Sequence, residues 1–163
     1  MRHTFHTTSY AQLYHPFDSC VGYELIDSLV AESSLLLNVW KAEIQPRLTH
    51  HRLIHHAYDV LTSFGIHHQD FLGVPWKSST LVYACSTCFD RDLMCQIAKK
   101  ALRELVPGTP IITLSKRLPT LEDVGEKLGR KITLIHTMRL PTSYHSATCY
   151  VQLVTASHSP LAV

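Results

Sequence analysis

Short apolar runs of strand type alternate along this chain with segments of helical period, and that order limits the folds open to it. The strand-type runs occupy residues 20–26, 64–72, 79–86, 111–114, 131–140 and 146–154. The helical segments occupy residues 27–61, 90–105 and 119–129. This succession predicts an α/β fold with a mostly parallel sheet. The turn between the last two strand runs is too short for a parallel crossover, so these runs should form an antiparallel hairpin.

Local signals sharpen this prediction. In the first helical segment, Pro46 predicts a kink or a break, followed by a second helical piece over residues 53–61. Asp90 is a candidate N-cap for the second segment, and Gly129 should end the third. Residues 79–86 are apolar without alternation, which is typical of a strand buried on both faces.

Composition excludes several classes of protein. The 163 residues are 45% hydrophobic and 17% charged, which suits a globular domain with a core. The formal charge is +2 and no block of five like charges occurs, so we expect no strong direct binding to nucleic acid. No apolar run is long enough for a membrane span, and residues 1–19 do not resemble a secretory signal. Five cysteines, an odd number, favour reduced thiols in an intracellular protein.

In open α/β sheets the ligand lies outside the carboxyl ends of the strands. Glu24 ends the first strand run, where a carboxylate can accept hydrogen bonds from both hydroxyls of a ribose. A solvated acid at a helix start is the alternative for Glu24. Asp70 and Phe71 end the second run, where they could bind an adenine amino group and pack on its ring. Together these two strand ends favour an adenosine site.

The pair Cys85-x-x-Cys88 ends the third strand run and is open to three interpretations. A redox motif needs a helix N-terminus that stabilises a thiolate, and Asp90 and Asp92 oppose this with negative charge. A structural zinc site needs two further ligands at suitable spacing, which the remaining cysteines do not offer. We favour small residues lining a cleft, with Cys85 and Ser86 as candidate catalytic residues and no metal.

Two further groups are open to a functional or an ordinary interpretation. Six of the twelve histidines lie between residues 50 and 68, where no carboxylate completes a His-Glu-x-x-His pattern. A polar helix face is the preferred interpretation over a metal site. Lys116 and Arg117, after the fourth run, could contact a carboxylate or phosphate, or could simply be exposed.

In this order, the segments VGYELI, HHQDFL, LVYACSTCFDRDL, PGTPIITLSKRLP and SATCYVQLV resemble class I S-adenosylmethionine-dependent methyltransferases. They are most similar to the disruptor-of-telomeric-silencing family, the histone lysine methyltransferases without a SET domain. The resemblance implies a Rossmann-like sheet, S-adenosylmethionine as cofactor and a histone or nucleosome as a partner. Glu24 would bind the ribose, Asp70 and Phe71 the adenine, and Cys85 would lie near the transferred methyl group.

The chain departs from this family at two places. The family's first strand and Gly-rich cofactor loop should precede Val21, but residues 1–19 contain no glycine, so the first strand is expected to be absent. The chain is then either a fragment or has lost cofactor binding. Where the family has an asparagine near the methyl group, this chain has Cys85. We therefore expect an irregular segment 1–19, a partial methyltransferase domain 20–156 and a tail 157–163.

The predicted function is protein lysine methylation on the histone core, in the nucleus. The alternatives are a truncated, non-catalytic binding module of the same fold and a cytoplasmic methyltransferase that acts on a small molecule.

Overall fold

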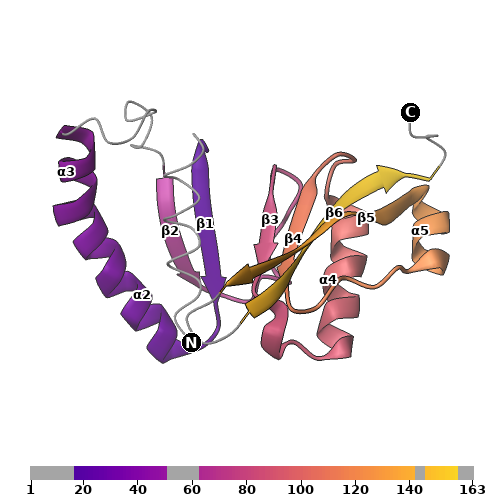
Figure 1. Cartoon of the computed structure of the whole chain (residues 1–163), viewed down its shortest axis with the longest axis horizontal. Helices are drawn as coiled ribbons and strands as arrows, with labels where there is room; N and C mark the ends of the chain where they lie inside the picture. The colour runs from indigo at the N-terminus through magenta and orange to yellow at the C-terminus, as the bar shows by residue number, and fades with distance from the viewer. Residues whose placement is uncertain (1–16, 51–62, 142–145, 158–163) are drawn as a thin grey trace. The chain divides into compact units, whose positions relative to one another are not determined.

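A computed structural model describes residues 17–50, 63–141 and 146–157 (Figure 1). The chain divides into two compact units, Met1–Gly73 and Val74–Val163. The predicted domain 20–156 runs through both units. The strand run predicted from residue 20 begins one residue earlier, at Ser19. The predicted helical piece 53–61 lies outside the described residues.

The first unit contains a parallel pair of strands and a helical segment. Strand β1 (Ser19–Glu24) pairs along its whole length with β2 (Ser63–His68), so that Glu24 lies opposite His68. The strand predicted over residues 64–72 therefore stops at His68 and leaves Asp70 in the following loop. Helix α2 (Asp27–Val39) comes between these strands in the sequence, which makes the unit a β-α-β arrangement.

The helical segment changes geometry just before Pro46. Helix α2 passes into a π-helical turn, η1 (Trp40–Ile44), and then into α3 (Gln45–His50). The Gln45 N–H donates to the Trp40 carbonyl, five residues back. Proline has no N–H to donate. The break predicted at Pro46 therefore takes the form of a π turn that ends at Ile44, two residues before it.

Trp40 forms the centre of the first unit's core. It is 7% exposed and is packed against half-buried Cys20, Leu36, Leu37 and Ile66, from α2 and both strands. The helical period predicted from the sequence thus places Leu36 and Trp40 on the same buried face.

The second unit contains a four-stranded sheet of order β3-β4-β6-β5. The strands are β3 (Val82–Ala84), β4 (Pro110–Leu114), β5 (Arg130–Pro141) and β6 (Ser146–Ala156). β3 pairs with β4 in parallel, whereas β6 is antiparallel to both β4 and β5. β3, β4 and β5 therefore run in one direction, and β6, inserted between β4 and β5, is reversed.

This topology confirms the predicted α/β class, with mostly parallel strands and a final antiparallel hairpin. The hairpin pairs Arg130 with Ala156 at one end and Pro141 with Ser146 at the other, with a bulge between Leu134 and His136. The complete burial predicted for residues 79–86 is wrong. β3 has only three residues, all half-buried, because it is a short outer strand with β4 as its one described neighbour.

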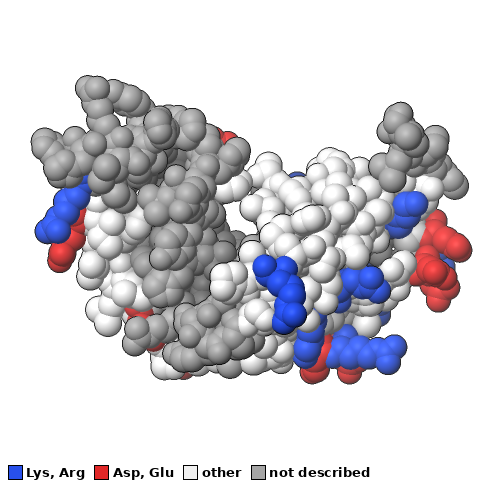
Figure 2. All heavy atoms as spheres, viewed as in Figure 1, with Lys and Arg blue, Asp and Glu red and all other residues white. Residues whose placement is uncertain are grey.

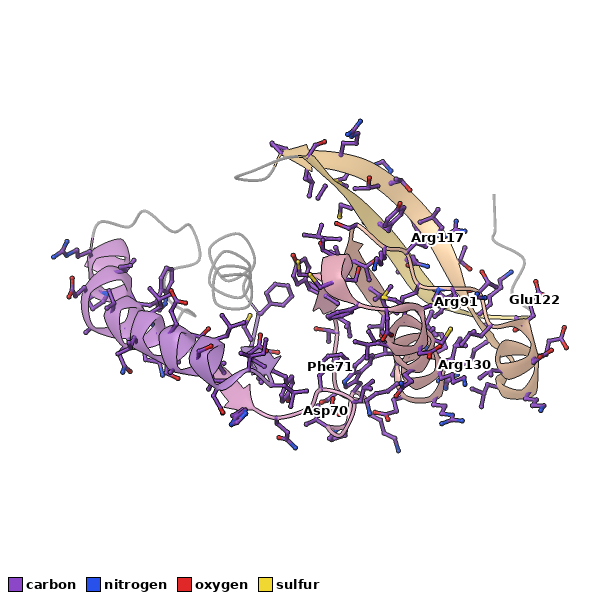
Figure 3. The ribbon with its side chains drawn as sticks, turned by 90° about the horizontal axis from the view of Figure 1, so that it is seen from below. Asp70, Phe71, Arg91, Arg117, Glu122 and Arg130 are labelled. Atoms are coloured by element: carbon purple, nitrogen blue, oxygen red, sulfur yellow. The ribbon has the colours of Figure 1, made fainter. Side chains whose placement is uncertain are left out.

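Helices α4 (Arg91–Glu104) and α5 (Glu122–Leu128) cover one face of this sheet (Figure 3). The predicted N-cap is confirmed, since Asp90 Oδ1 accepts from the Leu93 N–H at 2.8 Å. Gly129, at φ +61°, ends α5 as predicted. Arg130 donates to the carbonyls of Leu102 and Leu105 and so satisfies the carboxyl end of α4.

The core of the second unit lies between these helices and the sheet. Its largest fully buried apolar side chains are those of Ile97, Leu102, Leu105, Ile111, Leu118 and Val154, each no more than 1% exposed. Among the described residues, no helix has the length and hydropathy needed to cross a membrane.

Candidate functional site

Glu24 is held in the turn between β1 and α2. Its Oε1 accepts from the backbone N–H groups of Leu25 at 2.8 Å and Ile26 at 3.0 Å. The carboxylate therefore lies at the carboxyl end of β1, as predicted, and at the start of a helix as well. Both interpretations of Glu24 are compatible with this position, since a carboxylate fixed by backbone donors can also receive a ligand.

Histidines at the end of β2 fasten the same turn. His68 Nε2 lies 3.1 Å from the Leu25 carbonyl oxygen and 3.2 Å from Asp27 Oδ1. Because both partners are acceptors, Nε2 carries a proton. His67 stacks on Tyr23, its partner across the pair, with ring centroids 5.7 Å apart. The sequence indicated a polar helix face for these histidines but not this contact, because the contact depends on the parallel register of β1 and β2.

Asp70 and Phe71 lie in the loop after β2 (Figure 3). Asp70 Oδ1 accepts from the Leu72 N–H at 2.8 Å, and the Asp70 carbonyl accepts from Gly73 at 3.0 Å. This Asx turn exposes the carboxylate, while the Phe71 ring is half-buried. Glu24 and Asp70 thus both follow the carboxyl ends of paired strands. Their roles towards ribose and adenine stay predictions.

Cys85 and Ser86 follow the carboxyl end of β3 in the second unit, as predicted. Ser86 is fully buried, and its Oγ lies 2.6 Å from the Leu114 carbonyl oxygen and 2.9 Å from that of Lys116. Its single proton is shared between these two acceptors. Ser86 therefore fastens the turn after β4 to the end of β3, and a catalytic role for it stays a prediction.

A pair of hydroxyl groups joins the same two strand ends. Thr87 Oγ1 lies 2.8 Å from Ser115 Oγ, and Cys85 Sγ lies 3.9 Å from Thr87 Oγ1. Ser115 has φ +70°, a conformation that non-glycine residues rarely adopt. Its N–H donates to the Thr148 carbonyl on β6 at 2.7 Å, which helps to hold this backbone. Such strain often accompanies functional sites.

The cysteine pair opens a short 3₁₀ turn, η2 (Ser86–Cys88), rather than a long helix. Cys85 is half-buried and Cys88 exposed, and neither forms a disulfide. Burial raises the pKa of the fully enclosed Cys149 thiol. Among the described residues, no three His, Cys, Asp or Glu side chains gather as a metal site would require.

The basic residues after β4 are exposed. The Lys116 ammonium donates to the Phe89 carbonyl, which ties the turn to the loop before α4. Arg117 is also exposed (Figure 3). The structure thus brings Cys85, Thr87, Ser115 and Lys116 to one edge of the second unit. Glu24, Asp70 and Phe71 belong to the first unit.

No protein-family profile matches the chain, and no curated protein matches it. Solved structures do. The chain is similar to an RNA methyltransferase from Salinibacter ruber in complex with S-adenosyl-L-homocysteine, at 14% identity over 86% of this chain and 68% of that chain, with TM-score 0.47. It is also similar to the N-methyltransferase NodS from Bradyrhizobium japonicum WM9, at 10% identity over 83% and 72%, with TM-score 0.48.

A third similar structure is magnesium protoporphyrin IX methyltransferase (ChlM) from Synechocystis PCC 6803 with bound SAM. The identity is 10% over 82% of this chain and 58% of that chain, with TM-score 0.49. Identities of 10% to 14% with TM-scores below 0.5 assign neither a substrate nor a residue role to this chain.

Proposed function

We propose that the chain is an S-adenosylmethionine-dependent methyltransferase. The observation that supports this most is the sheet of the second unit, where the single reversed strand β6 is inserted between β4 and β5. This strand contains SATCYVQLV, the segment that resembles the terminal hairpin strand of class I methyltransferases. Thiol and hydroxyl side chains gather at the carboxyl ends of β3 and β4, where such folds bind their ligands.

The residues of the first unit suit part of the cofactor. A fixed carboxylate at the end of β1 matches a ribose diol, and the exposed Asp70 carboxylate beside a half-buried ring matches an adenine amino group. Residues 1–19 contain no glycine with which to form the loop that holds the methionine part in this family. We therefore expect the adenosine part to be bound and the methionine part to be held weakly.

The proposed chemistry depends on positioning. S-adenosylmethionine would supply an electrophilic methyl group on its sulfonium. The chain's own task is to align a neutral nucleophile and exclude water, and good alignment can lower such a barrier by several kcal/mol, up to about 7–11. One of the Thr87 and Ser115 hydroxyls donates a hydrogen bond to the other. The pair therefore keeps one hydroxyl proton and several lone pairs with which it could bind the methyl-accepting substrate.

For the methyl acceptor, we propose a lysine amine of the histone core, following the sequence resemblance, and with it a nuclear location. A small-molecule acceptor in the cytoplasm is the second candidate. The third candidate is a binding module without catalysis. It is favoured by the hydrogen bonds of Ser86 to two backbone carbonyls, because these bonds give the hydroxyl a structural role.

Calorimetry with S-adenosylhomocysteine tests the cofactor site. Glu24→Ala removes a charge-assisted pair of hydrogen bonds, each worth about 1.5–3 kcal/mol, so affinity should fall at least about tenfold. Glu43→Ala is the matched control, since Glu43 is an exposed acid on η1 of the same unit, away from the turn that holds Glu24, and its loss should leave affinity unchanged. If the intact chain binds too weakly to measure, a homologous first strand and Gly-rich loop should be grafted ahead of Ser19. Equal affinity of the grafted protein and its Glu24→Ala variant would refute the adenosine site.

Transfer of a labelled methyl group tests the acceptor. Nucleosomes, free histones, RNA and a set of small amines should be offered to the chain or to the grafted protein. We expect labelling of a histone lysine. Labelling of a small amine alone would establish the second candidate, and cofactor binding without any transfer would establish the third.

A further inference from the structure

Strand β5 forms an outer edge of the second unit's sheet. β6 pairs with it on one side, and no described strand pairs with it on the other. The hairpin also extends past β4, because β4 ends at the pairing of Leu114 with Cys149 whereas β5 continues to the pairing of Pro141 with Ser146. The backbone groups on this edge are therefore available to a further strand.

The last eight residues of β5 are exposed and include large apolar side chains. Every residue from 134 to 141 is exposed, and four of them are large and apolar: Leu134 at 39%, Ile135 at 49%, Met138 at 37% and Leu140 at 37%. Ile135 is the residue of the bulge, without a partner in the register. The bulge changes the face on which the side chains lie. Met138 and Leu140, opposite Cys149 and Ala147, share one face of the sheet, whereas Leu134, opposite Gln152, lies on the other. Exposed apolar side chains gathered on an edge strand are a common feature of interaction sites.

The charge of this hairpin has a single sign. No Asp or Glu occurs from residue 130 to the end of the chain, whereas β5 contains Arg130, Lys131 and Arg139. Arg130 caps α4, which leaves Lys131 and Arg139 exposed towards the two ends of the strand. In the view of Figure 2, the surface of the second unit is mainly uncharged. Some Lys and Arg side chains lie on it away from acidic residues, and others lie beside the Asp and Glu at its margins.

We propose that the free edge of β5 binds an extended segment of a partner protein, rich in alternating acidic and apolar residues, as an added strand. Backbone hydrogen bonds along the edge would provide affinity. After the bulge, Met138 and Leu140 would contact the apolar side chains of the segment on one face, and Arg139 would bind its carboxylates on the other. Lys131 would attract carboxylates towards the start of the strand. The binding does not depend on methyl transfer.

The same charges disfavour two other occupants. Pairing of β5 with a second copy of itself would bring Lys131 and Arg139 of both copies together with no acidic residue to offset them. Single-stranded nucleic acid is bound mainly through Phe, Tyr and Trp side chains on which bases stack, and β5 contains none of these three. An acidic peptide would instead pair its carboxylates with Lys131 and Arg139, and it needs no aromatic side chains on the strand.

The test uses the full chain and a fluorescein-labelled peptide of about ten residues that alternates glutamate with valine. A single added strand is a small interface, so we expect a dissociation constant of about 10–100 μM by fluorescence polarisation. A peptide with lysine in place of glutamate should bind at least about tenfold more weakly. A peptide with proline at alternate positions should not bind, because proline cannot donate along the edge.

Charge reversal on the protein separates this site from general attraction. The double variant Lys131→Glu/Arg139→Glu should bind the glutamate peptide at least about tenfold more weakly and prefer the lysine peptide. The matched control is Lys99→Glu/Lys127→Glu, the same change of charge at exposed positions of α4 and α5, and it should retain the affinity within about twofold. Equal losses in the two double variants would overturn the site.

A measurement on the unaltered chain keeps the test valid if a variant fails to fold. Hydrogen exchange followed by mass spectrometry should show that the glutamate peptide slows exchange in β5 but not in α5. Self-association of the chain without peptide, or tighter binding of a uridine oligonucleotide than of the glutamate peptide, would overturn the proposal.

Discussion

The side-chain amide of Gln152 on β6 forms two hydrogen bonds with the backbone of Leu118. The Leu118 N–H donates to Oε1 at 2.9 Å, and Nε2 donates to the Leu118 carbonyl at 3.1 Å. Both residues are buried, at 2% and 1% exposed. The side-chain amide thus pairs with both backbone hydrogen-bonding groups of one residue in the loop after β4, as a neighbouring strand would. With Ser86, which binds the carbonyls of Leu114 and Lys116, it fixes the first part of this loop, around strained Ser115.

Gln152→Leu should destabilise the second unit. The variant leaves a buried N–H and a buried carbonyl of Leu118 without partners, and each costs about 1–3 kcal/mol. We expect a loss of at least about 2 kcal/mol in the free energy of unfolding, measured with urea. Gln96→Leu, the same change at an exposed position of α4, should alter stability by no more than about 0.5 kcal/mol. Similar effects of the two variants would contradict the role of Gln152.

Gly125 has a steric role in α5. An alanine inside a helix is ordinarily more stable than glycine by about 0.5–1 kcal/mol. At this position a Cβ would lie 2.5 Å from the Arg130 carbonyl oxygen, a backbone atom that cannot move independently. Gly125→Ala should therefore destabilise the protein by about 1–3 kcal/mol. Thermal unfolding of this variant should be compared with that of Glu126→Ala, at the exposed neighbouring position, for which no loss is expected. A stabilised Gly125→Ala would show that the helix can shift.

Local features of the fold could be predicted from the sequence. The Asp90 cap and the end of α5 at Gly129 depend on residues that are near in the chain. The hairpin followed from the shortness of its turn. The insertion of β6 between β4 and β5 could not be predicted, because antiparallel pairing with β4 joins segments over thirty residues apart and leaves no local pattern.

The candidate site was predictable in position more than in detail. Strand ends directed attention to Glu24, Asp70 and Cys85, but not to the hydrogen bonds that each one makes. Thr87 was overlooked because its partner Ser115 is brought close only by the pairing of β3 with β4. Gln152 was overlooked because a polar residue in a strand normally indicates a solvent-facing position.

A pH-dependent contribution to stability is expected from Glu104 on α4. Burial raises the pKa of this carboxyl, but the Lys100 hydrogen bond, at 2.6 Å, and the Trp76 N–H, at 2.7 Å, outweigh it and hold the pKa below its usual value. Because the folded-state pKa is lowered, the stabilisation is present above the unfolded-state pKa and is lost as pH falls through the folded-state value.

Glu104→Gln should therefore lower the free energy of unfolding at pH 7 by about 1–2 kcal/mol, and the difference from the unaltered chain should shrink below about pH 4. Glu126→Gln, at an exposed position of α5, controls for the change of net charge. Urea titrations at pH 7 and pH 3 measure the effect. An equal loss for Glu104→Gln at pH 7 and at pH 3 would contradict an electrostatic contribution.

The cysteines should react with iodoacetamide in an order set by burial and thiol pKa. The thiolate is the reactive form. Cys88 is exposed on a short turn, whereas Cys149 is 4% exposed on β6 and its pKa is raised by burial, so both access and thiolate content are lower there. At pH 8 in the folded protein, Cys88 should be alkylated at least about tenfold faster than Cys149. Peptide mass spectrometry over a time course measures both rates, and Cys88→Ser should remove the fast phase. In urea the two rates should converge, which identifies the fold as the cause. Fast alkylation of Cys149 in the native chain would show that the β4–β6–β5 core opens far more readily than its burial indicates.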